Sequence, residues 1–126
     1  MSLSFDFEGC ILCVTIDGGF SFEEAEQMRV DVLSDPNFVK GMRLLIDARK
    51  ARGNPSSNKT RERAAYLASV SENISPGIAL VVSKPLYYGL GRMFQIFASL
   101  YKVKIEIFMD IHEARQYLER GEKNTG

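Results

Sequence analysis

Two cysteines with the spacing of a redox pair, Cys10 and Cys13, stand near the start of the chain. A C-x-x-C pair forms a disulfide in redox proteins and supplies half of a tetrahedral zinc site in others. The apolar residues 11–16 predict a strand, on which side chains three apart point to opposite faces. The sequence holds no second cysteine pair to complete a zinc site. We therefore expect two reduced cysteines packed in or near the core, with no metal site and no cofactor.

A hydrolase triad would need Ser56 or Ser57 to meet His112, the only histidine, and Asp110. Nucleophilic catalysis requires the base to lie within hydrogen-bond reach of the hydroxyl. No Gly-x-Ser-x-Gly elbow presents either serine in the way that many hydrolases use. We assign no catalytic residue and expect that the protein is not an enzyme. A small hydrolase is the third of the three functions considered below.

Charge is divided unevenly along the chain. Sixteen basic residues balance sixteen acidic ones. The first 38 residues hold eight acids and one base, a net charge of −7, and the remainder holds fifteen bases and eight acids, a net charge of +7. Overall neutrality excludes a uniformly basic nucleic-acid binder, so we expect no nucleic-acid partner.

Much of the positive charge is concentrated between residues 40 and 63. Lys59, Arg61 and Arg63 fall in the first turns of a predicted helix, where the helix dipole disfavours cations and backbone N–H groups suit an anion. We predict an anion- or partner-binding site formed by Arg49, Arg52, Ser57 and Arg92. The alternatives are a solvated loop and self-association of the acidic first helix with this basic loop.

Hydrophobic periodicity predicts a β-hairpin followed by alternating helices and strands. The expected strands are residues 4–7, 10–16, 42–48, 78–82 and 103–108, the last with the alternating charges of an edge strand. The expected helices follow the N-caps Ser21 and Asp110, span 59–73, and start at Pro85. The fold class is therefore α/β, with four helices and a five-stranded, mostly parallel mixed sheet whose first strand is antiparallel. One domain is expected over residues 1–126, with about the last five residues frayed.

The chain has 126 residues, of which 45% are hydrophobic and 25% charged. This is the composition of an ordinary globular domain. No apolar run approaches the roughly 20 residues of a membrane span. Residues 1–9 lack the basic start and apolar stretch of a signal peptide. We expect a cytoplasmic protein with no membrane span.

Four segments resemble those of the SpoIIAA-like fold, which houses STAS domains and related small bacterial proteins. They are Val-Thr-Ile-Asp-Gly at 14–18, Leu-Leu-Ile-Asp-Ala-Arg at 44–49, Tyr-Gly-Leu-Gly-Arg-Met-Phe at 88–94 and Phe-Met-Asp-Ile-His-Glu-Ala at 108–114. The resemblance covers residues 4–118 and implies a β-α superhelix led by an antiparallel strand. It also implies that the chain binds and regulates rather than catalyses.

The resemblance bears on two serines as well. Anti-sigma-factor antagonists of this family are phosphorylated on a serine after the central strand, and the corresponding region here contains Ser56 and Ser57. Pro55 and Asn58 stand where the family motif has aspartate and glycine. The resemblance thus makes Ser56 and Ser57 candidate phosphorylation sites, and the alternative is that they are loop and N-cap residues.

The predicted third helix has more apolar side chains than one buried stripe needs. Tyr87, Tyr88 and Ile96 are the candidate surface for an apolar ligand or a homodimer contact. If all helices pack on one side of the sheet, the apolar central strands need cover on the other side as well. An apolar ligand or a second subunit would provide that cover.

Three functions are consistent with these observations. The leading hypothesis is a non-catalytic STAS-like binding or regulatory module, which binds a protein partner or forms a homodimer and takes a small anionic ligand at its basic loop. The alternative is a carrier or sensor of a lipid-like apolar ligand seated between the third helix and the sheet. The small hydrolase is the third.

Overall fold

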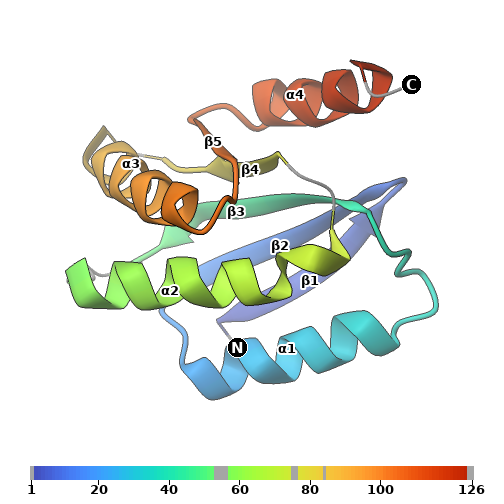
Figure 1. Cartoon of the computed structure of the whole chain (residues 1–126), viewed down its shortest axis with the longest axis horizontal. Coiled ribbons are helices and arrows are strands. Elements are labelled where there is room, and N and C mark those ends of the chain that lie inside the picture. Colours follow the sequence, from blue (N-terminus) through green and yellow to red (C-terminus); the bar gives the residue numbers. More distant parts are fainter. Residues whose placement is uncertain (1, 53–56, 75–76, 84, 125–126) are drawn as a thin grey trace.

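The computed structural model describes residues 2–52, 57–74, 77–83 and 85–124. Within these residues, one sheet contains β1 (Leu3–Glu8), β2 (Ile11–Gly18), β3 (Arg43–Ala51), β4 (Ile78–Val81) and β5 (Ile105–Phe108), in that spatial order. The helices are α1 (Phe22–Ser34), α2 (Ser57–Val70), α3 (Pro85–Leu100) and α4 (Ile111–Asn124), with a short 3-10 helix at Ser71–Asn73. β1 is antiparallel to β2 and the other neighbours are parallel. The predicted α/β architecture is confirmed (Figure 1).

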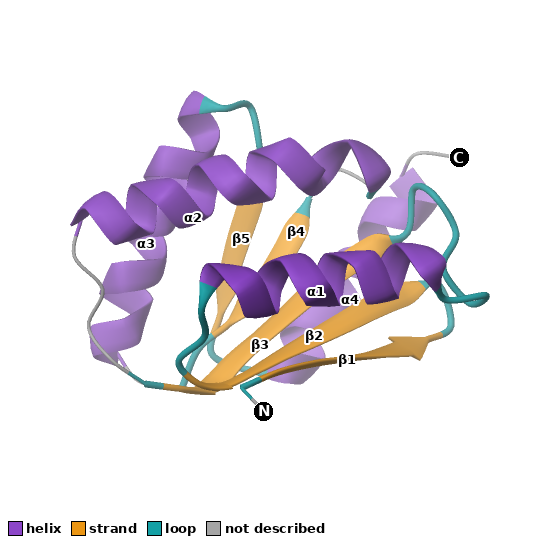
Figure 2. Ribbon diagram, turned by 90° about the horizontal axis from the view of Figure 1, so that it is seen from below, coloured by secondary structure: helices purple, strands orange, loops and turns teal. Residues whose placement is uncertain are grey.

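The helices lie on both sides of the sheet. Because β2 to β5 are parallel and follow one another in sequence order, right-handed crossovers place α1, α2 and α3 on one face. α4 follows the last strand and packs on the opposite face, against β3, β4 and β5 (Figures 1 and 2). The sheet is therefore the middle layer of three.

α4 covers the second face of the sheet, where the sequence led us to expect a ligand or a second subunit. Ala114 and Leu118 of α4 are fully buried in one cluster with Leu45, Ala79 and Val81 of the central strands. The condition that all helices pack on one side does not hold. The second face of the central strands is covered by the chain itself.

Some element boundaries differ from those expected. The hairpin turn is at Gly9 and Cys10, with Gly9 at φ +59°, so Cys10 lies in the turn and is exposed. The prediction that Cys10 packs in or near the core is wrong for this reason. β3 continues to Ala51, beyond the expected residue 48, and α2 begins at Ser57 rather than at 59.

The predicted N-caps of α1 and α4 are confirmed. The Ser21 hydroxyl accepts a hydrogen bond from the backbone N–H of Glu24 at 3.1 Å, and the Glu24 carboxylate accepts one from the backbone N–H of Ser21 at 3.2 Å. Asp110 accepts a hydrogen bond from the backbone N–H of His112 at 2.7 Å. These side chains bond to N–H groups that a helix leaves unpaired in its first turn.

Replacing Ser21 by alanine should lower the free energy of unfolding by about 1 kcal/mol, because the capping hydrogen bond to Glu24 is lost. Urea unfolding followed by circular dichroism measures the change. Ser34→Ala, at the exposed last residue of the same helix, is the matched control and should change stability by less than about 0.5 kcal/mol. Equal effects of the two substitutions would contradict a stabilising cap.

Among the described residues, no helix combines the length and the apolar character that crossing a membrane requires.

Candidate functional site

A large apolar cavity lies between α1, α2 and the sheet face that they cover. Its volume is about 600 Å³, within the range of roughly 300–1,000 Å³ typical of small-molecule sites. β1 to β4 form the floor, α1 and α2 form the walls, and α3 contributes Leu90 and Phe94. The floor and walls are mainly aliphatic and include Leu12, Val14, Ile16, Leu44, Ile46, Ala48, Ala25, Met28, Val32 and Leu67. Figure 2 shows α1 and α2 side by side in front of these strands.

Short side chains leave this space open. Thr60 of α2 and Ala48 and Ala51 of β3 line the cavity, and these side chains fill less space than the larger aliphatic side chains around them. The small size of these side chains therefore contributes to the cavity. The sequence pattern identifies their positions only as apolar or inward-facing.

Aromatic side chains join α1 to α2 near the start of α1. The rings of Phe22 and Tyr66 meet edge to face, with centroids 5.6 Å apart. The Tyr66 hydroxyl donates a hydrogen bond to the carbonyl oxygen of Ala25 at 3.3 Å. Phe20, in the loop before α1, stacks under the guanidinium of Arg63, whose central carbon is 4.5 Å from the ring centroid. All of these residues line the cavity.

The charged groups that line the cavity differ in how they are neutralised. Arg29 forms an ion pair with Glu26 at 2.8 Å. Arg63 is half-buried, and loss of water around its guanidinium lowers the pKa of Arg63 from its ordinary value. Arginine nevertheless stays protonated at neutral pH. Among the described residues, no carboxylate forms an ion pair with Arg63.

The three arginines of the predicted anion site do not form one cluster. Arg49 is bonded to Asp47 through two contacts of 2.9 and 2.8 Å, and these hydrogen bonds hold the pKa of Asp47 below its usual value. Asp47 and Arg49 share the sheet face of α4, whereas Arg52 lines the cavity on the other face. Ser57 begins α2, and its side chain lies outside the described part of the structure.

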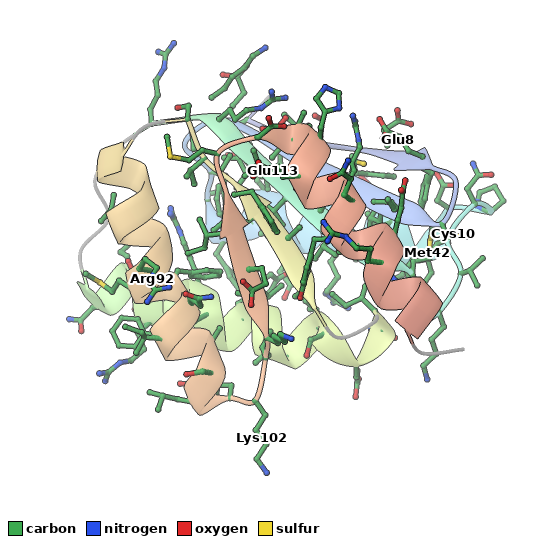
Figure 3. All side chains as sticks on the ribbon, turned by 90° about the horizontal axis from the view of Figure 1, so that it is seen from above. Glu8, Cys10, Met42, Arg92, Lys102 and Glu113 are labelled. Carbon is green, nitrogen blue, oxygen red and sulfur yellow. The ribbon has the colours of Figure 1, made fainter. Side chains whose placement is uncertain are left out.

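Arg92, the fourth member, is exposed on α3. Figure 3 places it across the molecule from Glu8 and Cys10 of the hairpin. It does not line the cavity. An anion that binds both Arg49 and Arg52 would have to extend around the end of the sheet. Of these two residues, the structure therefore favours only Arg52 as part of a binding site.

The remaining candidate residues are placed as follows. Ser56 and the side chains of Tyr87 and Tyr88 fall outside the described residues, so the predictions that concern them stay predictions. Ile96 is 59% exposed on α3. His112 is exposed at the start of α4, and the side chain of Ser57 is outside the described part of the structure, so the hydrolase hypothesis stays a prediction.

The two cysteines are free and have different surroundings. Cys10 is exposed, whereas Cys13 is half-buried beside the cluster under α4. Burial, together with the Glu8 carboxylate, raises the pKa of the Cys13 thiol to about 11. Cys13 is thus protonated at neutral pH and is a poor nucleophile. Within the described residues, no three histidine, cysteine, aspartate or glutamate side chains are grouped to hold a metal ion.

Iodoacetamide at about pH 8 should therefore alkylate Cys10 well before Cys13, because a thiol with a pKa near 11 is ionised about 100-fold less than an ordinary one. A time course of peptide mass spectrometry measures both rates in one sample. In urea the two rates should converge. Equal rates in the folded protein would contradict the protected state of Cys13.

Nothing in the sequence singles out Phe20, Tyr66 or the cavity floor as functional. The spacing of Phe22, Ala25, Met28 and Val32 is that of an ordinary amphipathic helix and carries no sign that a space lies beneath them. Arg63 does fall within the basic run between residues 40 and 63. A small signal for the cavity is the short side chain of Thr60, at an inward position of α2.

In comparisons with known proteins, no family model, no curated protein and no solved structure matches this chain.

Proposed function

We propose that this protein is a non-catalytic binding protein that holds a lipid-like apolar ligand between α1, α2 and the sheet. The observation that carries the proposal is the apolar cavity of about 600 Å³. A hydrocarbon chain in this cavity gains contacts with its aliphatic lining and is removed from water without needing hydrogen bonds. The ligand position differs from the one expected from sequence, which was between the third helix and the sheet.

The proposal stays within the class of binding and regulatory modules that the resemblance to STAS domains implies. It assigns an apolar ligand to the cavity, where the leading hypothesis from sequence had a small anion at the basic loop, and it needs no catalytic residue. Partner binding, a homodimer and phosphorylation of Ser56 or Ser57 remain separate predictions. Phosphopeptide mapping of the protein from its native host tests the last of these.

Displacement of Nile red, a neutral dye that fluoresces in apolar surroundings, tests the proposed function. The dye should bind saturably, at one molecule per chain, and dodecyl compounds should displace it. Native mass spectrometry of the purified protein provides an independent readout, since a hydrocarbon ligand that co-purifies adds a defined mass. Failure of every dodecyl compound to displace the dye would overturn the proposal.

A further inference from the structure

We propose that the ligand of the cavity is an anionic amphiphile, whose carboxylate or phosphate head group binds Arg63 near the start of α1 and whose chain occupies the apolar space. This inference rests on the proposed function, because it takes the binding of an apolar chain as given and assigns the chemistry of the head group.

Arg63 is a partly desolvated cation in the cavity wall. Its guanidinium lines the cavity beside Phe20, at 4.5 Å from the ring centroid, and is half-buried. Desolvation is the cause that lowers the pKa of Arg63, and no carboxylate in the described part of the chain offsets it with an ion pair. A partly desolvated cation is stabilised by an anion that accepts its N–H groups, and the planar guanidinium matches a carboxylate or a phosphate in geometry.

A second arginine of the cavity wall, Arg29, provides an internal comparison. Arg29 also lines the cavity, but Glu26 of the same helix already binds it at 2.8 Å. Its charge is neutralised by the chain, so Arg29 has no need of a charged ligand. This difference places the head group at Arg63 rather than farther along α1.

The surroundings of Arg63 favour an anion over a cation. Arg52 also lines the cavity, and its backbone N–H donates to the carbonyl oxygen of Gly18 at 3.1 Å, which holds the end of β3 beside the end of β2. Arg52, Glu23 and Glu62 all line the cavity and are all exposed, so water screens their charges, and the half-buried Arg63 sets the preference.

Nile red displacement by four compounds with the same chain tests the head group. Dodecanoate and dodecyl phosphate should bind at least about tenfold more tightly than dodecanol, and dodecyltrimethylammonium more weakly than dodecanol. Arg63→Met should remove the preference for the two anions and leave dodecanol unchanged. Arg63→Lys should retain part of it. Arg61→Met is the matched control, because Arg61 is exposed on the same helix, 5.1 Å from the Phe97 ring centroid, and does not line the cavity.

The outcomes separate the two proposals. If dodecanol binds wild-type protein as tightly as dodecanoate does, or if Arg63→Met keeps the anion preference while remaining folded, the head-group assignment is overturned and the apolar site stands. If no dodecyl compound displaces the dye, the proposed function fails first. Inorganic phosphate and acetate alone should not displace the dye. If they do so at concentrations similar to those of the dodecyl anions, the ligand is a small anion and the amphiphile is excluded.

Discussion

Replacing Ala48 by phenylalanine should lower the affinity for dodecyl ligands by at least about tenfold without unfolding the protein. Ala48 lies on the floor of the cavity, on the sheet face that α1 and α2 cover. A phenyl ring at this position occupies the space in which the hydrocarbon chain is proposed to lie. Filling an existing space adds packing contacts, so stability should stay the same or rise by about 0.5–2 kcal/mol. Nile red displacement and urea unfolding measure the two effects.

Two matched substitutions make this result specific. Ala79→Phe introduces the same ring on the opposite sheet face, where Ala79 is fully buried beneath α4, and should cost about 1–3 kcal/mol or more. Val30→Phe, at an exposed position of α1 outside the cavity, should alter neither binding nor stability. If Ala48→Phe destabilises the protein as much as Ala79→Phe does, the space beside Ala48 is not available and the cavity proposal loses its basis.

Replacing Leu118 by alanine should lower the free energy of unfolding by about 3 kcal/mol. Leu118 is fully buried where α4 covers β3 and β4, in the cluster that includes Leu45 and Val81. Removing its branched end leaves a void that the surrounding side chains fill only in part, so transfer and cavity costs add. A loss of this size is a large share of the roughly 5–15 kcal/mol that stabilises a domain.

Ile96→Ala is the control for this effect. Ile96 is an aliphatic side chain of similar size, but it is exposed on α3. Its truncation should change stability by less than about 0.5 kcal/mol. Urea unfolding of both variants distinguishes the two positions. Similar losses for Leu118→Ala and Ile96→Ala would mean that α4 does not anchor the second face of the sheet.

Predictions from local chemistry agreed well with the structure. The capping residues Ser21 and Asp110 fixed where α1 and α4 begin, because a side chain either reaches the first free N–H groups or does not. The apolar run at Leu44 and Leu45 predicted a strand covered on both faces, as observed. This apolar run did not predict which element covers the second face of the strand. In the structure, that element is α4.

Arg49 and Arg52 lie on opposite faces of the sheet for a reason that residue spacing alone does not give. β3 continues to Ala51, beyond the expected residues 42–48, and it contains an extra residue where Thr15 pairs with Asp47 but Asp17 pairs with Lys50. This irregularity interrupts the alternation of side chains, so Ala48 and Ala51, three residues apart, both line the cavity. Arg49 bonds to Asp47 on the face that α4 covers, whereas Arg52 lines the cavity.

The sequence by itself determined the order and type of the elements, the antiparallel first strand and the apolar positions that form the core. These features depend on residues close together in the chain, through hydrogen bonds, caps and periodicity. Only the tertiary structure decided that a cavity lies between α1 and α2 and that Arg63 and Phe20 stand beside it. A cavity remains where packed elements are farther apart than their side chains can fill. The distance between the elements is set by contacts among residues far apart in sequence.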